Sequence, residues 1–507
     1  MRKLNTTLLL LVFLSFIPDL VSAQSITVKQ SEEAPDYEYE VFRPAPGSFI
    51  AINYGSTHGA FSYKRNYSKP TITGYDKNMK EVYTRRFEEL EGNRYLGAIE
   101  FDKKLHIFCA DDEKIFSLPF DAVKAQAAGK LTEVLTATNE PESFYKGFSP
   151  DSNYCFAAFA CPHPRKSYQQ FEGVIMDKNM KVITKFSFQL EKIKSYIDNT
   201  TFVLSPEGTL YVVNQIRVKP EKNDFRPFQY LLTEVNKEGK TVTTALNDLP
   251  TGRLSNIVWT NSKSGLAFTG LLSKTEKEAF QYLVAGEFSS WSKKITGLKE
   301  LALANAPFWG QASGEFLLLM KTRGISANVK MVKYFILPDG AKIMVLQPLE
   351  SSTYFTSSNR AYTTTHAGSV YILKIKKELE LEWMQAIPLG QHEASYQIYC
   401  GVLPVLQNNK DLYIFFHDYI QNTGAQPAEA KEMGLGSSWP SIQLTSFHVN
   451  DKGALNRIKI ASYTPDEHRF APGWPNISAE GEAVITLYHH RNLGKSTYKL
   501  GLLNIKQ

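Results

Sequence analysis

The chain has few of the residues and motifs that mark metal, redox or hydrolytic sites. Its 507 residues include only four cysteines, which form neither a CxxC pair nor a Cys/His zinc pattern. The HExxH, Gly-x-Ser-x-Gly, P-loop and EF-hand spacings are also missing. No motif therefore points to a metal or a cofactor, and we expect neither. All four cysteines have apolar neighbours, so we expect buried free thiols; they are Cys109, Cys155, Cys161 and Cys400.

Long apolar runs are missing too, apart from one at the start of the chain. Met1-Arg2-Lys3 precedes the apolar stretch Leu8–Leu14, and Val21-Ser22-Ala23 follows it. These are the three parts of a secretory signal peptide. We therefore expect residues 1–23 to be removed and residues 24–507 to form one exported domain, periplasmic or extracellular. A membrane anchor is the alternative, but the run is short and Asp19 interrupts its end.

Charge of one sign is not in large excess. The formal net charge is +6, and it becomes +5 without residues 1–23, which carry Arg2, Lys3 and Asp19. Such a mildly basic balance does not require nucleic acid as a partner. No later stretch reaches the roughly 18 apolar residues of a transmembrane helix. We expect no nucleic-acid partner, no membrane-spanning segment, and a monomer.

The sequence is instead rich in strand-forming residues and in one repeated turn. In "GFSPDSNYCFAAF" (147–159) a polar turn separates two apolar stretches. A polar turn followed by a Val/Ile/Tyr/Phe run is a hairpin signal. Related turns precede β-rich runs elsewhere, at 205–209, 261–265, 311–315, 407–411 and 478–482.

A second turn alternates with the first. Asp-Lys-Asn-Met-Lys occurs at 76–80 and 177–181, with degenerate versions in "EVNKEGKTVTT", "FILPDGAKIMVL", "ILKIKKELELEWM" and "HVNDKGALNRIKI". We assign the first turn to strands one and two, and the second turn to strands three and four. A repeated four-stranded antiparallel unit is the blade of a β-propeller. The sequence therefore predicts an all-β propeller.

Counting these units gives nine. Their spans are 40–88, 95–137, 144–190, 199–247, 254–299, 306–350, 353–388, 396–463 and 470–507. Because nine exceeds the usual four to eight blades, one unit can be an insertion; we expect eight blades and keep seven to nine open. The last unit lacks a fourth strand, which Ser25–Gln30 could supply, closing the ring by pairing the N- and C-terminal segments. A pair of β-sandwiches is the alternative, but it would not explain the repeat.

The two clearest turns carry a family resemblance. "FSPDSNYCFAAF" and "LSPEGTLYVV" resemble the Ser-Pro-Asp-Gly repeats of TolB-type and related bacterial β-propellers. The likeness covers about ten residues per blade. It implies propeller architecture and no particular activity.

Basic residues gather in the expected loops between strands two and three. Five such loops carry net charges of +3, +2, +2, +3 and +3, whereas residues 24–507 carry +5 in all. A basic rim concentrates anions, and Arg binds carboxylate, sulfate or phosphate in bidentate fashion. Solvated loops without a ligand are the alternative. The candidate ligand-binding residues are Lys64, Arg65, His163, Arg165, Lys166, Arg217, Lys219, Arg226, Lys321, Arg323, His489 and Arg491.

One further loop stands out by length. Residues 417–441 hold His417, Asp418 and Trp439 among Gly and Pro, which suits a lid or equally a spacer. His489 and His490 are adjacent, so in a regular strand they face opposite sides and do not suit one metal ion.

Two functions from different classes fit these patterns. The first is an exported binding or scaffolding propeller whose basic rim takes an anionic glycan, an envelope component or a protein partner. The alternative is a lyase or hydrolase acting on acidic polysaccharide, in which His, Tyr and Arg would move protons beside a uronate. Without a catalytic motif, we favour the binding protein.

Overall fold

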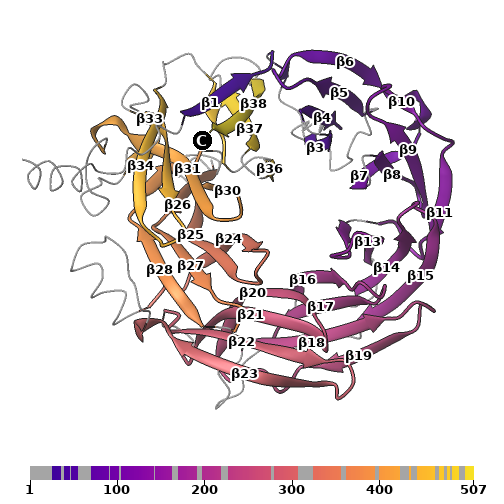
Figure 1. The fold of residues 1–507 in the computed structure, drawn as a ribbon. Helices are drawn as coiled ribbons and strands as arrows, with labels where there is room; N and C mark the ends of the chain where they lie inside the picture. The colour runs from indigo at the N-terminus through magenta and orange to yellow at the C-terminus, as the bar shows by residue number, and fades with distance from the viewer. Residues whose placement is uncertain are drawn as a thin grey trace, which may run out of the picture.

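The strands form eight sheets arranged in a ring, coloured in chain order in Figure 1, in the computed structural model of the chain. The structure describes these residues: 25–32, 34–35, 39–45, 47–54, 70–90, 92–101, 104–141, 143–162, 169–190, 197–218, 227–275, 279–305, 324–355, 361–378, 380–393, 399–422, 433–435, 442–462, 468–472, 477–479, 482–489 and 497–506. The predicted eight-bladed propeller of antiparallel four-stranded sheets is therefore confirmed.

The first five blades use successive strands from the inner edge outward. Blade 1 has β3 (Tyr39–Ala45), β4 (Ser48–Asn53), β5 (Thr71–Tyr75) and β6 (Glu81–Arg86); blade 2 has β7 (Arg94–Phe101), β8 (Lys104–Asp111), β9 (Lys114–Asp121), β10 (Gln126–Ala127) and β11 (Thr132–Thr136). Blade 3 has β12 (Ser143–Phe148), β13 (Tyr154–Pro162), β14 (Gln169–Asp177) and β15 (Val182–Leu190). Blade 4 has β16 (Ile197–Leu204), β17 (Leu210–Arg217), β18 (Phe228–Val235) and β19 (Thr241–Ala245); blade 5 has β20 (Arg253–Ser262), β21 (Gly265–Ser273), β22 (Tyr282–Ser289) and β23 (Lys294–Ala302).

The remaining blades depart from this simple order. Blade 6 has β24 (Val329–Ile336), β25 (Lys342–Phe355), β27 (Val370–Ile375) and β28 (Leu381–Ile387), and β26 (Ala361–Ala367), β29 (Gln391–Glu393) and β32 (Met433–Leu435) extend its sheet. Blade 7 has β30 (Leu403–Gln407), β31 (Asp411–Tyr419), β33 (Ile442–Val449) and β34 (Leu455–Ser462). Blade 8 has β35 (Arg469–Phe470), β36 (Ile477–Ala479), β37 (Glu482–His489), β38 (Thr497–Lys506), β1 (Ser25–Gln30) and β2 (Ala34–Pro35). The described helices are single 3₁₀ turns, η1 (Glu88–Leu90), η2 (Leu303–Asn305) and η3 (Ile420–Asn422).

The ninth unit of the sequence count disappears in blade 6. Units 306–350 and 353–388 contribute to one sheet, in which β24 pairs with β25, and β25 with β27. The turn in "FILPDGAKIMVL" therefore joins the first and second strands, and its assignment to strands three and four was wrong. A Pro-Asp-Gly turn serves either hairpin equally well, so its residues alone do not reveal its place in a blade.

The termini close the ring as expected. β1 runs antiparallel to β38, with Ser25 opposite Lys506 and Gln30 opposite Gly501. The β1 strand thus becomes the outer strand of blade 8, and the Lys29 ammonium donates to the Asn78 side-chain oxygen of blade 1 at 2.8 Å. Without β1 and β2, the outer edge of β38 would be unpaired.

Side-chain caps explain why the two turns repeat. Ser149 Oγ accepts from the Tyr154 amide at 3.0 Å and donates to Asp151 at 2.6 Å, which holds the turn between the first two strands of blade 3. In the second type of turn, Asp177 Oδ1 accepts from the amides of Asn179 and Lys181 at 2.8 and 3.0 Å. Asp76, Asn236 and Asn450 make the same pair of bonds in three other blades. The repeat therefore preserves an oxygen that satisfies turn amides.

This capping predicts a selective effect of substitution. Asp177→Ala should lower the free energy of unfolding by about 1 to 2 kcal/mol, because two turn amides lose their acceptor. Asp177→Asn should be nearly neutral, since Asn236 and Asn450 cap their own turns with the same oxygen. Urea unfolding of both variants measures the difference; equal losses for Ala and Asn would contradict the capping role.

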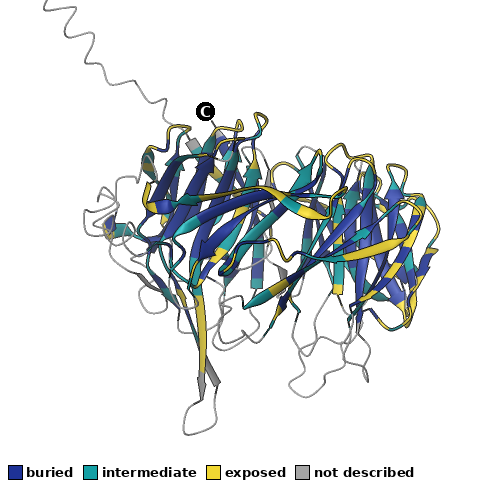
Figure 2. Ribbon diagram, turned by 90° about the horizontal axis from the view of Figure 1, so that it is seen from below, coloured by how far each residue is buried: buried dark blue, intermediate teal, exposed yellow. Residues whose placement is uncertain are grey.

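The core lies between the blades. Each middle strand is covered on both faces by neighbouring sheets, so β8 and β31 are buried along almost their whole length. The outer strand β15 instead alternates buried and exposed residues. Figure 2 shows this gradient. The strands inside each sheet are buried, and the turns along the upper side of the ring are exposed. All four cysteines are buried and free, as expected.

The ring has two different faces. The turn face carries the turns between strands one and two and between strands three and four, such as 149–153 and 177–181. The loop face carries the opposite ends of the strands, where strand two ends and strand three begins, such as Pro162 of β13 and Gln169 of β14. Of the residues expected to form a basic rim, the described ones, Arg217 and His489, lie at the loop face.

Candidate functional site

Most of the predicted rim residues lie outside the described residues. Ten of the twelve are in this group: Lys64, Arg65, His163, Arg165, Lys166, Lys219, Arg226, Lys321, Arg323 and Arg491. Arg217 and His489 are described, at the loop-face ends of β17 and β37 in different blades, so they do not share a site. The His489 ring faces the ring of His468 at 5.4 Å.

Arg217 is the predicted residue that stands beside a pocket. It ends β17 and remains largely exposed, and its guanidinium pairs with the Asp198 carboxylate at 2.9 Å. The guanidinium also lies over the Phe228 ring, 5.8 Å from its centre. These two contacts hold the charge in place, while its exposed side leaves donors for a second anion.

The pocket follows from strand register in blade 4. Side chains two residues apart share a face of a strand, about 7 Å apart, so Val213, Gln215 and Arg217 point to the same side of β17. Pairing places Thr201 opposite Val213, and Asn199 opposite Gln215, which is in turn opposite Tyr230. The row of Thr201 and Val213 and the row of Asn199, Gln215 and Tyr230 line the pocket. Arg217 lies two residues beyond Gln215 on β17, nearer the loop face.

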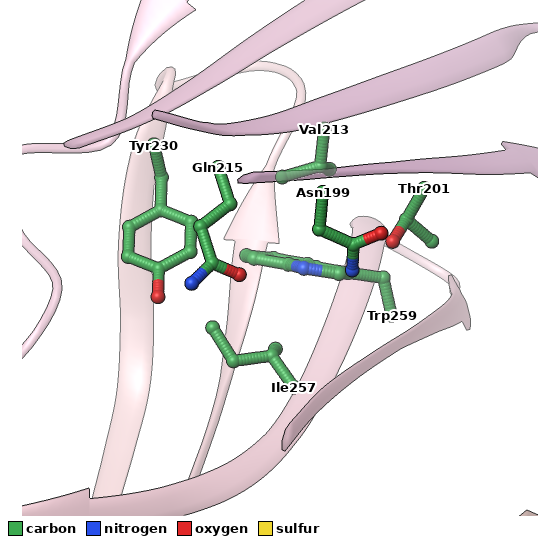
Figure 3. Close-up of a pocket in the computed structure, with 7 residues that line it drawn as sticks. All are labelled: Asn199, Thr201, Val213, Gln215, Tyr230, Ile257 and Trp259. Atoms are coloured by element: carbon green, nitrogen blue, oxygen red, sulfur yellow. The ribbon is translucent and has the colours of Figure 1, made fainter. Parts of the chain in front are cut away.

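The neighbouring blade completes the pocket with Ile257 and Trp259 of β20. Figure 3 shows the amides of Asn199 and Gln215 and the hydroxyl of Thr201 gathered around the indole of Trp259. The empty space between these side chains is about 200 Å³ when open solvent is counted, so the enclosed part is much smaller. Drug-sized ligands use larger pockets, of roughly 300 Å³ or more. This one is a shallow depression that can take an edge of one sugar ring or a smaller polar group.

A bulge in β20 shapes this wall. The register shifts between Ser255 and Val258, and Asn256 takes a left-handed conformation with φ of 51°. Its side-chain nitrogen donates to the Val329 carbonyl of blade 6 at 3.0 Å. Gly270 lies opposite, where a Cβ would approach Ile257 to 3.1 Å. The bulge turns Ile257 toward blade 4, and the small Gly270 leaves room for it.

The chemistry of this lining favours binding over proton transfer. Among the described residues that line the pocket, Tyr230 alone is titratable, and its hydroxyl donates to the Leu254 carbonyl at 2.9 Å. Burial raises the pKa of Tyr230, so the phenol stays protonated at neutral pH. The lining otherwise offers two carboxamides, one hydroxyl and the small exposed part of Trp259, a core residue that is 6% exposed. Such groups stack on rings and hydrogen-bond hydroxyls.

His417 and Asp418 are buried strand residues, which corrects their placement in a long loop. Both belong to β31. The His417 Nε2 lies 2.5 Å from the Phe470 carbonyl oxygen of blade 8, and the Asn422 side chain donates to Asp418 at 2.6 Å. Burial lowers the pKa of His417 to about 4. The His417 contact joins blades 7 and 8, and both side chains are buried, with no access for a solute.

Part of segment 417–441 adds to a sheet. Met433–Leu435 forms β32, which pairs in parallel with β29 beside blade 6. The stretches 423–432 and 436–441, including Trp439, lie outside the described residues, so a lid or spacer role stays untested.

The described residues contain no group of three or more His, Cys, Asp or Glu side chains placed to hold a metal ion. In the same residues, no helix is long and apolar enough to cross a membrane.

The comparisons with known proteins support the β-propeller fold and nothing more specific. No protein-family model matches the chain, and no curated protein matches it. Among solved structures, it is similar to the Dos1 propeller, with 8% identity, a TM-score of 0.38, and 94% of this chain and 95% of that chain covered. The β-propeller domain of the trilobed protease from Pyrococcus furiosus has 11% identity, a TM-score of 0.31, and coverage of 71% and 92%.

A third similar structure is a post-proline cleaving enzyme from Rickettsia typhi. It has 11% identity, a TM-score of 0.37, and coverage of 92% of this chain and 57% of the enzyme. Likenesses this remote carry no argument about activity. The propeller architecture implied by the resemblance to TolB-type repeats is present, but no family match supports the TolB-type assignment itself.

Proposed function

We propose that the chain is an exported β-propeller that binds an anionic glycan at the pocket between blades 4 and 5. One sugar ring sits against Trp259, its hydroxyls bond to Asn199, Gln215 and Thr201, and its acidic group reaches Arg217. The protein acts as a monomer outside the cytoplasm, in the periplasm or beyond.

The observation that carries this proposal is a pocket lined by neutral hydrogen-bonding groups with Arg217 at its entrance. Neutral hydrogen-bonding groups surround an indole, and an arginine held by Asp198 stands at the next position on the same face of β17. The small exposed part of the indole offers one apolar contact to a sugar ring, and carboxamides suit its hydroxyls. An arginine beside them favours a uronate or a sulfated sugar over a neutral one.

Arg217 provides the first test. Arg217→Ala should weaken binding of an acidic oligosaccharide about tenfold or more, because a charge-assisted hydrogen bond is lost. Binding of the corresponding neutral oligosaccharide should not change. Calorimetric titration with oligogalacturonate and with a neutral galactan fragment measures both, and Arg86→Ala, an exposed arginine on the outer strand β6, is the matched control.

The same samples distinguish binding from cleavage. We expect a salt-sensitive affinity without new reducing ends and without the absorbance of unsaturated uronate. Product formation by the wild-type chain would favour the lyase or hydrolase and contradict the binding role. Equal affinity of the wild type and the Arg217→Ala variant for the acidic probe would remove Arg217 from the site.

A further inference from the structure

Large apolar side chains are exposed on the turn face of the ring. Of the eight that are exposed in the described part of the chain, seven lie within two residues of a turn on the turn face. They are Val82, Val123, Phe148, Ile183, Val242, Trp291 and Ile336; the eighth, Leu298, is in the middle of β23. Most loop-face connections lie outside the described residues; on the turn face, each of blades 1 to 6 exposes at least one large apolar side chain, and this recurrence favours an interaction surface.

Lysines accompany these side chains in a regular order. In blades 1, 3 and 4 a lysine ends the turn between strands three and four, and the exposed aliphatic residue follows two positions later: Lys80 and Val82, Lys181 and Ile183, Lys240 and Val242. In blade 2, Val123 is next to Lys124, and in blade 5, Trp291 precedes Lys293 and Lys294. Figure 1 shows that the outer strands β6, β15, β19 and β23 follow the circumference.

The aspartates of these turns are occupied by hydrogen bonds, whereas Glu238 is exposed between Lys237 and Lys240. Asp76, Asp121 and Asp177 each accept hydrogen bonds from amides of their own turn. The lysines of the same turns are exposed. The arc over blades 1 to 5 therefore presents cationic and apolar groups side by side, which is the composition of a surface that contacts anionic lipid headgroups.

Trp291 is the most prominent of these groups. Its side chain is 95% exposed at the tip of the turn between β22 and β23. Its neighbours fix the turn: the Ser290 hydroxyl bonds Tyr211 at 2.9 Å, the Ser290 amide donates to Ser264, and the Lys293 ammonium pairs with Glu234 at 2.6 Å. Because this rigid turn keeps the whole indole in water, the favourable free energy of burying a tryptophan is not gained in the isolated protein. That free energy is gained if the indole enters an interface.

We infer that the turn face docks on an anionic phospholipid bilayer, with Trp291 inserted at the headgroup level and the lysines of blades 1 to 5 against lipid phosphates. This inference is separate from the glycan pocket. The β1 strand begins at Ser25 beside Lys506, at this same face. Docking by the turn face directs the loop face, with Arg217 and the pocket, away from the membrane.

Vesicle co-sedimentation tests the docking surface. Residues 24–507 should sediment with vesicles of phosphatidylcholine and phosphatidylglycerol in equal parts, and much less with phosphatidylcholine alone or at high salt. Trp291→Ser should reduce partitioning about tenfold, and Lys240→Glu with Lys294→Glu should act in the same direction. Leu298→Ser, an exposed apolar residue away from the turn face, is the matched control and should bind as the wild type does.

The alternatives predict different results. Equal vesicle binding by the wild type and Trp291→Ser, or no binding of the wild type at low salt, would overturn the inference. Sedimentation equilibrium without lipid tests whether a second copy of the chain covers this surface. Dimerisation of the wild type but not of Trp291→Ser would show that it does, and would also overturn the inference of membrane docking. Thermal melting should be unchanged in these variants, because each replaced side chain is exposed.

Discussion

Deletion of residues 24–32 should destabilise the whole ring. The deletion removes β1, whose six residues pair with β38. It also removes the bonds between Ser31 and Leu500, and the contacts of Ile26 and Val28 with the core between blades 7, 8 and 1. At about 1 kcal/mol per backbone bond, the loss of unfolding free energy is on the order of 5 kcal/mol. Calorimetry of the deleted chain against a chain that begins at Gln24 measures this effect.

Single substitutions in β1 test whether the packing of its side chains, in addition to its backbone pairing, stabilises the ring. Val28→Ser should lower the melting temperature, because Val28 packs on the core. Thr27→Ala, at an exposed position of the same strand, should have little effect. An unchanged melting temperature after the deletion would show that the ring closes without β1 and would contradict this role of the N-terminal segment.

Acid should destabilise the protein between about pH 6.5 and pH 4. Burial lowers the pKa of His417 to about 4, and burial with the nearby Lys104 does the same for His106. In the unfolded chain these imidazoles bind protons near pH 6.5. The unfolded state therefore binds more protons in this window, and stability falls as the pH falls. Each histidine contributes about 3 kcal/mol to the loss, complete below about pH 4.

His417→Gln isolates this effect. A glutamine amide can still donate to the Phe470 carbonyl, which accepts from His417 Nε2 if that nitrogen carries the proton, but it does not titrate. Burial raises the pKa of the neighbouring Asp418, which has the opposite dependence on pH and is present in both proteins. Urea unfolding at pH 7.5 and pH 4.5 should show a smaller loss in the variant. Parallel losses would contradict a neutral buried His417.

The fold was predictable because each blade repeats local signals. Ser149, Ser205, Asp76 and Asp177 cap turns through bonds within a few residues, so their spacing alone locates hairpins. In the blade 6 turn at 337–341, Asp339 accepts from the Ala341 amide as Asp151 does from Asn153 in the first turn of blade 3, but the Pro-Asp-Gly residues suit either hairpin, so the unit was miscounted. Its place in the blade depends on pairing between β24 and β25, which is not a local property.

The candidate site was less predictable, for a related reason. Arg217 was found from its loop composition, but Asn199, Gln215 and Trp259 come from three strands in two blades. Their convergence depends on register and on the β20 bulge at Asn256. One local signal was available: Gln215 and Arg217 share a face of a strand that is otherwise mostly buried. His417 and Asp418 were misplaced because polar residues at a strand end resemble the start of a loop.

Hydrogen exchange with an acidic oligosaccharide bound tests the central claim most directly. Oligogalacturonate and a sulfated glycan serve as probes against residues 24–507, with a neutral galactan fragment as reference. A glycan pocket between blades 4 and 5 predicts slower amide exchange in β16, in the end of β17 and in β20 with the acidic probes. Protection confined to other blades, or equal protection by the neutral fragment, would contradict a glycan site built on Trp259 and Arg217.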